Sequence, residues 1–226
     1  MLSVREVAKM IDHSLLRPEL TGEDVRAGCA LAASYGTASV CVRPSDVAAA
    51  VSALAGTRVL VGTVVGFPHG STTTATKVAE TRELVAAGAA EIDMVVHVGR
   101  LRDGEANYVQ DDIAAVVAAA GGRTVKVILE NALLDRDSIV LGCRLAEAAG
   151  AHFVKTSTGF AGGGATAEDI ALMRATVAPH IGVKAAGGVR TLDRLLELAT
   201  LGATRFGATA TAVILDDLTS RAHRSG

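Results

Sequence analysis

The feature that most constrains the fold is a repeated alternation of short β-branched segments with Ala-rich segments. Eight segments of strand length occupy residues 10–15, 38–42, 58–65, 90–97, 124–130, 151–156, 181–185 and 204–207. Segments with apolar residues at helical spacing lie between them, for example at 45–54, 74–87, 106–119, 136–149, 167–177 and 191–199. Strand–helix units in series predict an α/β fold, in which a parallel sheet carries its helices on the outside.

The junction from helix to strand is itself repeated. The tetrad Ala-Ala-Gly-Ala occurs at 86–89 and at 148–151, and Leu-Gly-Ala occurs at 201–203. Gly56, Gly88, Gly150 and Gly202 stand where helix C-terminal caps are expected. No linker or shift in composition divides the 226 residues, so we expect one domain over 1–226. Eight units in this length predict a single (β/α)8 TIM barrel, whose chemistry lies at the C-terminal ends of the strands.

Charge and composition exclude several classes of protein. The net charge is -2 and the arginines are scattered, so no basic patch indicates nucleic-acid binding. The first residues carry charges at Arg5, Glu6, Lys9 and Asp12, unlike a signal peptide, and no segment resembles a membrane span. The three cysteines form no C-x-x-C pair, which is typical of reduced thiols. We therefore expect a soluble cytoplasmic protein that binds neither membrane nor nucleic acid.

Charged residues interrupt five of the predicted apolar strands. Lys126, Lys155 and Lys184 follow one another at intervals of 29 residues, and Asp12 and Asp93 interrupt two other strands. A single strand lysine could extend its amine out of the barrel mouth, but buried Lys and Asp are costly unless they are paired. A neighbouring cation lowers the pKa of a lysine, and a neutral lysine forms Schiff bases with carbonyl compounds. The pattern predicts class I aldolase chemistry.

The segments that follow strands 6, 7 and 8 predict a phosphate site. Glycines allow backbone N–H groups to approach a ligand closely, and a helix N-terminus favours an anion. The loops after strands 7 and 8 bind phosphate in many barrels of this kind. Alternatively, these glycines serve only as tight turns. The candidate phosphate-binding residues are Gly159, Gly187, Gly188, Gly207 and Thr209.

Other polar residues give weaker signals. His13, His69, His97 and His152 have no metal-ligand spacing, so we expect no metal, and no segment predicts a dinucleotide cofactor. Glu130 ends a strand and could pair structurally with a lysine. Cys41 is interpreted as a packed thiol rather than a nucleophile, because no histidine is adjacent to it in sequence.

Eight motifs in order along the chain resemble the deoxyribose-phosphate aldolase family: IDHSLL, SVCVRP, VVGFPHG, EIDMVVHVG, KVILEN, FVKTSTGF, VKAAGGVRT and RFGAT. The resemblance implies a lyase with a (β/α)8 barrel that uses neither a metal nor another cofactor. It implies reversible cleavage of 2-deoxy-D-ribose 5-phosphate to acetaldehyde and D-glyceraldehyde 3-phosphate, in deoxynucleoside catabolism. The partners would be sugar phosphates and aldehydes, and the family allows a homodimer.

The resemblance also assigns roles to residues. Lys155 would form the Schiff base, Lys184 would be the second catalytic lysine that lowers the pKa of Lys155, and Asp93 would be the general acid and base, acting through a water. The supporting polar residues would be Asp12, Lys126 and Thr158. The phosphate contacts would come from Gly159, Gly187, Gly188, Gly207 and Thr209.

The chain departs from the family pattern in three places. Ser14 stands where many members have Thr, Ala210 replaces a second hydroxyl residue, and the C-terminal R-A-H-R-S-G has no Tyr. We expect these changes to affect turnover rather than the class of reaction. Two alternatives stay open. One is another Schiff-base sugar-phosphate aldolase or a transaldolase-like enzyme; the other is a barrel that binds sugar phosphates without catalysis.

Overall fold

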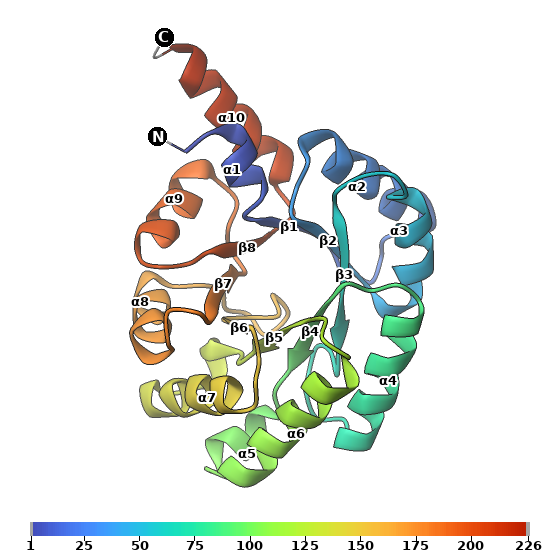
Figure 1. The fold of residues 1–226 in the computed structure, drawn as a ribbon. Coiled ribbons are helices and arrows are strands. Elements are labelled where there is room, and N and C mark those ends of the chain that lie inside the picture. The colour runs from blue at the N-terminus through green and yellow to red at the C-terminus, as the bar shows by residue number, and fades with distance from the viewer. Residues whose placement is uncertain (1, 225–226) are drawn as a thin grey trace.

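The protein forms a closed barrel of eight parallel strands, in which each strand pairs with the next and β8 pairs with β1 (Figure 1). This computed structural model describes residues 2–224, so the last two residues of the R-A-H-R-S-G segment lie outside the described part. The predicted (β/α)8 barrel is confirmed. The strands are β1 (Ile11–Leu15), β2 (Ser39–Val42), β3 (Leu60–Val65), β4 (Glu91–Val95), β5 (Thr124–Ile128), β6 (Phe153–Lys155), β7 (Gly182–Ala186) and β8 (Arg205–Ala208).

Helices surround the barrel on its outer face (Figure 1). Six of them match predicted segments: α3 (Val47–Ala53), α4 (Thr74–Ala86), α6 (Ala106–Ala119), α7 (Arg136–Ala148), α8 (Ala167–Thr176) and α9 (Leu192–Thr200). Four were not among the helical segments taken from the sequence: α1 (Val4–Ala8), α2 (Gly22–Tyr35), α5 (Val98–Arg102) and α10 (Thr211–Arg224). Two short 3-10 helices lie at Pro44–Asp46 and Asn131–Leu133.

The repeated glycine junction works as the sequence predicts. Gly56, Gly88, Gly150 and Gly202 all have positive φ angles, between 79° and 106°. Gly88 and Gly150 directly follow the C-terminal cap residues of α4 and α7. A left-handed residue at this point ends a helix and turns the chain toward the next strand, and only glycine adopts it without strain.

The apolar core lies between the barrel wall and the helices. Strand residues such as Val40, Ile92 and Val154 are fully buried in one cluster with the inner faces of the helices. Because side chains alternate along a strand, the intervening positions point into the barrel. On β4 these intervening residues are Glu91, Asp93 and Val95, all buried. The barrel interior therefore holds buried charged side chains that the surrounding apolar core lacks.

A buried ion pair joins α4 to α6 outside the barrel. Lys77 Nζ lies 2.5 Å from Asp112 Oδ2, and neither side chain is appreciably exposed. Lys77 Nζ also donates to the carbonyl oxygen of Val95 at 3.0 Å, and Thr74 Oγ1 donates to Asp112 Oδ1 at 2.7 Å. Sequence analysis did not single out this pair.

Removing the negative charge from this pair is expected to destabilise the protein. Asp112→Asn leaves the Lys77 ammonium buried and uncompensated, so the free energy of unfolding should fall by about 3 kcal/mol. Urea denaturation of both proteins measures the change. Asp111→Asn is the matched control, because Asp111 is the exposed neighbour on the same helix. Equal stability of the two variants would contradict a structural role for the pair.

Candidate active site

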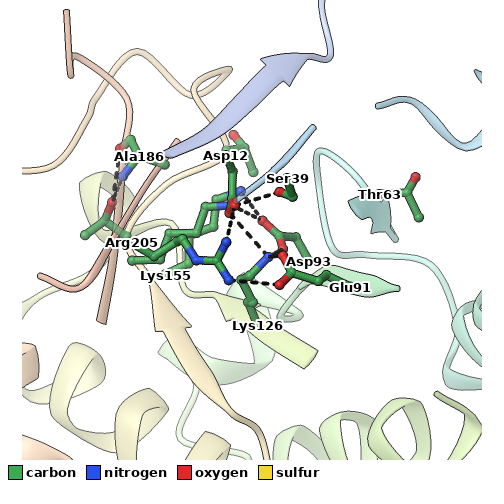
Figure 2. A network of polar contacts seen from close by, with 12 residues as sticks. Asp12, Ser39, Thr63, Glu91, Asp93, Lys126, Lys155, Ala186 and Arg205 are labelled. Atoms are coloured by element: carbon green, nitrogen blue, oxygen red, sulfur yellow. Dashed lines mark hydrogen bonds and ion pairs between the residues drawn. The ribbon is translucent and has the colours of Figure 1, made fainter. Parts of the chain in front are cut away.

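Three lysines from neighbouring strands converge on one carboxylate inside the barrel. Figure 2 shows Asp93 with two of them, Lys126 and Lys155. Lys155 Nζ on β6 lies 2.8 Å from Asp93 Oδ2, and Lys184 Nζ on β7 lies 2.7 Å from the same oxygen. Lys126 Nζ on β5 donates to the other oxygen of Asp93, Oδ1, at 2.9 Å. The register explains the arrangement, because Asp93 pairs with Lys126 and Lys155 pairs with Lys184 on adjacent strands.

Asp12 on β1 is the second carboxylate that the lysines share. Its Oδ2 lies 2.6 Å from Lys184 Nζ and 3.3 Å from Lys126 Nζ, as ion pairs without aligned hydrogen bonds. Its Oδ1 accepts a hydrogen bond from Ser39 Oγ at 2.6 Å. The structure thus brings together all five charged strand residues that the sequence singled out.

Two further members of this group were missed by sequence analysis. Glu91 Oε2 accepts from Lys126 Nζ at 2.7 Å. Arg205 donates through Nη1 to Asp12 Oδ1 at 2.7 Å and through Nη2 to Glu91 Oε1 at 2.8 Å (Figure 2). Glu91 stands two positions before Asp93, on the same face of its strand, and that spacing was the available signal. We call Asp12, Glu91, Asp93, Lys126, Lys155, Lys184 and Arg205 the charged cluster.

The environment separates the three lysines by their affinity for a proton. Burial lowers the pKa of Lys155, and the nearby charge of Lys184 lowers it further, against the attraction of Asp93. Burial also opposes charge on Lys184, but Asp12 and Asp93 outweigh it and raise the pKa of Lys184. Lys126 likewise has a raised pKa, because Asp12, Asp93 and Glu91 outweigh its burial. Lys155 is the lysine that most readily becomes neutral.

A cavity of about 280 Å³ opens above the lysines. Lys155 and Lys184 line it, whereas Asp93 and Lys126 are not among its lining residues. Its wall comes from the ends of β6, β7 and β8 with the segments that follow them, and from β1 with the segment that follows it. All five residues predicted to bind phosphate are on this wall: Gly159, Gly187, Gly188, Gly207 and Thr209. The cavity therefore joins two lysine side chains to a glycine-rich rim.

Two loops on this rim approach each other so closely that only glycine fits. Gly187 and Gly188 have φ angles of 84° and 82°. A Cβ on Gly187 would lie 2.8 Å from the Cα of Gly164, and a Cβ on Gly164 would lie 2.5 Å from the carbonyl oxygen of Gly187. Glycines at such a turn allow backbone N–H groups to approach a bound group closely.

The suggested pairing of Glu130 with a lysine is wrong. Within residues 2–224 no lysine contacts its carboxylate; instead Glu130 accepts from the backbone N of Thr158 at 3.2 Å and from its hydroxyl. The reason is the left-handed backbone of Glu130, with φ 62°, which breaks the strand alternation. Thr158, predicted to be a supporting residue, is thus anchored beside the cavity that it lines.

Cys41 also lines the cavity and is buried. Burial raises the pKa of its thiol to about 11, so it is a neutral thiol at physiological pH. Among the described residues no group of three or more His, Cys, Asp or Glu side chains could hold a metal ion. No helix within the described range is long and apolar enough to cross a membrane.

Comparison with known proteins agrees with this geometry. A family model described as DeoC/LacD family aldolase matches residues 6–214. A deoxyribose-phosphate aldolase of Staphylococcus epidermidis is 53% identical over 213 residues, covering 94% of this chain and 97% of the relative. Deoxyribose-phosphate aldolase 2 of Staphylococcus aureus is 54% identical over 211 residues, covering 93% and 96%.

A solved structure extends the comparison to the fold. The deoxyribose phosphate aldolase of Aeropyrum pernix, described as tetrameric, superposes with a TM-score of 0.90 at 30% identity, and the match covers 97% of this chain and 93% of that one. Sequence and fold thus lead to one conclusion: the chain belongs to the DeoC/LacD family of aldolases.

Proposed function

We propose that this protein is a class I aldolase that reversibly cleaves 2-deoxy-D-ribose 5-phosphate to acetaldehyde and D-glyceraldehyde 3-phosphate. The observation that carries the proposal is the pair Lys155 and Lys184, which share one carboxylate oxygen and both face the cavity. Two buried ammonium groups on one oxygen favour loss of a proton from one of them. The names of the relatives support the choice of substrate.

In this proposal Lys155 is the nucleophile. Its neutral amine attacks the C1 aldehyde of the open-chain sugar, and loss of water gives an iminium ion. The iminium then accepts the electron pair of the C2–C3 bond when the C3 hydroxyl loses its proton. Glyceraldehyde 3-phosphate leaves, and an enamine stays on Lys155. Protonation of the enamine at C2 and addition of water release acetaldehyde and the free amine.

Asp93 and Lys184 would move the protons. The attractions of Lys126, Lys155 and Lys184 outweigh burial and hold the pKa of Asp93 well below its usual value. Asp93 is therefore ionised in the free enzyme and able to accept. Because it lies beneath the cavity rather than on its wall, a proton from the C3 hydroxyl would reach it through Lys184 or a water. General acid–base catalysis of this kind contributes roughly 10²–10⁴-fold.

The glycine-rich rim would hold the phosphate and thereby position the sugar above Lys155. Gly188→Ala adds a methyl group at φ 82° and strains the turn, which costs on the order of 1 kcal/mol or more. We expect KM for 2-deoxyribose 5-phosphate to rise about tenfold, which corresponds to ~1.4 kcal/mol. Steady-state kinetics with the phosphorylated and unphosphorylated sugars measure this.

The matched control for this prediction is Gly122→Ala. Gly122 has the same φ of 82° and the same open surroundings, but it is not among the residues that line the cavity. It should carry the same strain without a change in KM. A Gly188→Ala variant whose KM rises equally for unphosphorylated 2-deoxyribose would show that the rim does not bind phosphate.

A substrate panel tests the proposed function against its alternatives. Purified protein is incubated with 2-deoxyribose 5-phosphate, with fructose 6-phosphate plus erythrose 4-phosphate as acceptor, or with fructose 1,6-bisphosphate. In separate assays, acetaldehyde is detected by its reduction with NADH and alcohol dehydrogenase, and triose phosphates are detected with triosephosphate isomerase, glycerol 3-phosphate dehydrogenase and NADH. We expect acetaldehyde from the deoxy sugar alone. Cleavage of a ketose phosphate instead would favour another Schiff-base aldolase or a transaldolase-like enzyme, and binding without any product would favour a non-catalytic barrel.

The remaining predictions concern the setting of the reaction. Five expectations from the sequence stay predictions. They are a role in deoxynucleoside catabolism, a cytoplasmic location, reaction without a metal or other cofactor, a single domain over 1–226 and a homodimer. The names of the relatives support the expectation that sugar phosphates and aldehydes are the partners.

A further inference from the structure

We propose that Arg205 is a positioning residue whose permanent charge forces Lys155 to give up its proton. The inference rests on the proposed function, because it explains how the proposed nucleophile becomes neutral. Arg205 does not line the cavity. It joins the other members of the charged cluster through its bonds to Asp12 and Glu91 (Figure 2).

Arg205 competes with the lysines for the same carboxylates. Its Nη1 lies 2.7 Å from Asp12 Oδ1, while Lys184 Nζ lies 2.6 Å from Asp12 Oδ2. Its Nη2 lies 2.8 Å from Glu91 Oε1, while Lys126 Nζ lies 2.7 Å from Glu91 Oε2. Each of these carboxylates is thus paired both with Arg205 and with at least one lysine.

The charges of the cluster do not balance when every group is ionised. Four cationic side chains, Lys126, Lys155, Lys184 and Arg205, face three carboxylates. One positive charge is in excess, in a site where the lysines and carboxylates are nearly inaccessible to solvent. An uncompensated buried charge is costly, and the group that can lose it does so. Deprotonation of one lysine makes the cluster neutral.

Arginine is the one cation of the four that cannot supply that proton, because its pKa lies above 12. The proton whose loss makes the cluster neutral must therefore come from a lysine. Lys126 contacts Asp12, Glu91 and Asp93, and Lys184 contacts Asp12 and Asp93. Among the residues that the structure describes, Asp93 is the only carboxylate that Lys155 contacts. Lys155 is held least strongly in its charged form and loses the proton.

Few titratable or charged groups lie near Lys155 and Arg205, the two residues that the proposal couples. Lys155 faces Asp93 of β4, Lys184 of β7 and the thiol of Cys41 of β2. Lys184 is also the register partner of Arg205 on the adjacent strand. The other charged groups within reach of Arg205 are Asp12 of β1, Glu91 and Asp93 of β4, Lys126 of β5 and the more distant Lys9.

The test measures the protonation of Lys155 without any substrate. Wild type and variants are labelled with a trace of acetic anhydride, which acylates only neutral amines, at a series of pH values, and the Lys155 peptide is quantified by mass spectrometry. The midpoint of labelling is the pH at which half of the Lys155 amine is neutral. Arg205→Met removes the excess positive charge, so this midpoint should rise by about one pH unit or more. Labelling at pH values below both midpoints should then fall at least about tenfold. The acid limb of kcat/KM should move by the same amount, since cleavage requires the neutral amine.

A second variant should move the midpoint the other way. Glu91→Gln removes a negative charge and leaves two positive charges in excess, so the Lys155 midpoint should fall. The double variant Arg205→Met/Glu91→Gln removes one charge of each sign, and its midpoint should return close to that of the wild type. Arg174→Met is the control, because Arg174 is a half-buried arginine that donates to backbone carbonyls of Ile181, Val177 and Ala178 outside the cluster. It should lose stability without moving the midpoint.

Opposite shifts with recovery in the double variant would support the inference. A midpoint unchanged in Arg205→Met, with activity lowered equally at every pH, would overturn it and leave Arg205 a structural residue. If Arg205→Met does not fold, Glu91→Gln decides alone: a fall of the midpoint supports the coupling, and a rise or no change overturns it. Labelling needs no turnover, so failure of the proposed function would show separately, as a wild-type protein that labels normally but cleaves nothing.

Discussion

Lys155→Leu is expected to abolish cleavage of 2-deoxyribose 5-phosphate, with a loss of at least about 10⁴-fold in kcat/KM. The variant has no amine to form the iminium, and neither Lys126 nor Lys184 takes its place, because their carboxylate partners keep both of them protonated. The phosphate rim is untouched, so binding of glyceraldehyde 3-phosphate should persist in isothermal titration calorimetry. Loss of activity with retained binding separates the chemistry from recognition.

Lys77→Met is the control for this experiment. Lys77 is also a fully buried lysine paired with a carboxylate, but it lies between α4 and α6, outside the barrel. The control should lose stability and keep the activity of its folded fraction. If Lys155→Leu cleaves the sugar at more than about one hundredth of the wild-type rate, the loss is far smaller than predicted. That result would show that another group carries the carbonyl chemistry.

Asp93→Asn is expected to slow cleavage of the C2–C3 bond by about 10²–10⁴-fold and to slow imine formation less. An amide cannot take the C3 hydroxyl proton, whereas attack by Lys155 depends only on its neutral amine. The variant also leaves an additional uncompensated positive charge in the cluster, so its stability should fall. Rapid-quench reduction with borohydride gives the rate of imine formation, and acetaldehyde release gives the overall rate.

Asp112→Asn provides the comparison for Asp93→Asn. It removes a buried carboxylate that is paired with a lysine, but at a distance from the cavity, so any loss there reflects stability alone. Equal slowing of imine formation and cleavage by Asp93→Asn would contradict the assignment of Asp93 as the acid and base.

The fold was predictable because one pattern recurs eight times. Each β-branched segment became a strand, although the bounds differ by a few residues. The segment 90–97 contains β4 at Glu91–Val95, whereas β7 and β8 end one residue beyond the predicted segments 181–185 and 204–207. Helices α2 and α10 were not proposed from the sequence. Helix α2 begins with a capping box between Thr21 and Asp24 and ends at the left-handed Gly36, so the local signals for it were present.

The site was predictable only where polar residues break an apolar strand. Lys155, Lys184 and Asp93 stand out because each directly follows a β-branched apolar residue in a largely apolar strand. Glu91 and Arg205 begin their strands, where charged residues are common. The spacing of Glu91 from Asp93 was the available signal for Glu91, and nothing in the sequence distinguishes Arg205 from a surface charge. Their role depends on the closure of the barrel, which brings Glu91 of β4 within 2.8 Å of Arg205 of β8. No local pattern encodes a contact between residues so distant in the chain.

Reductive trapping tests the central claim most directly. The protein is incubated with 2-deoxyribose 5-phosphate and borohydride, and the modified peptide is mapped by mass spectrometry. The account predicts a single adduct on Lys155. An adduct on Lys126 or Lys184 would keep the Schiff-base reaction and contradict the assignment of the nucleophile. A folded protein that binds the sugar and gives no adduct would contradict the Schiff base itself.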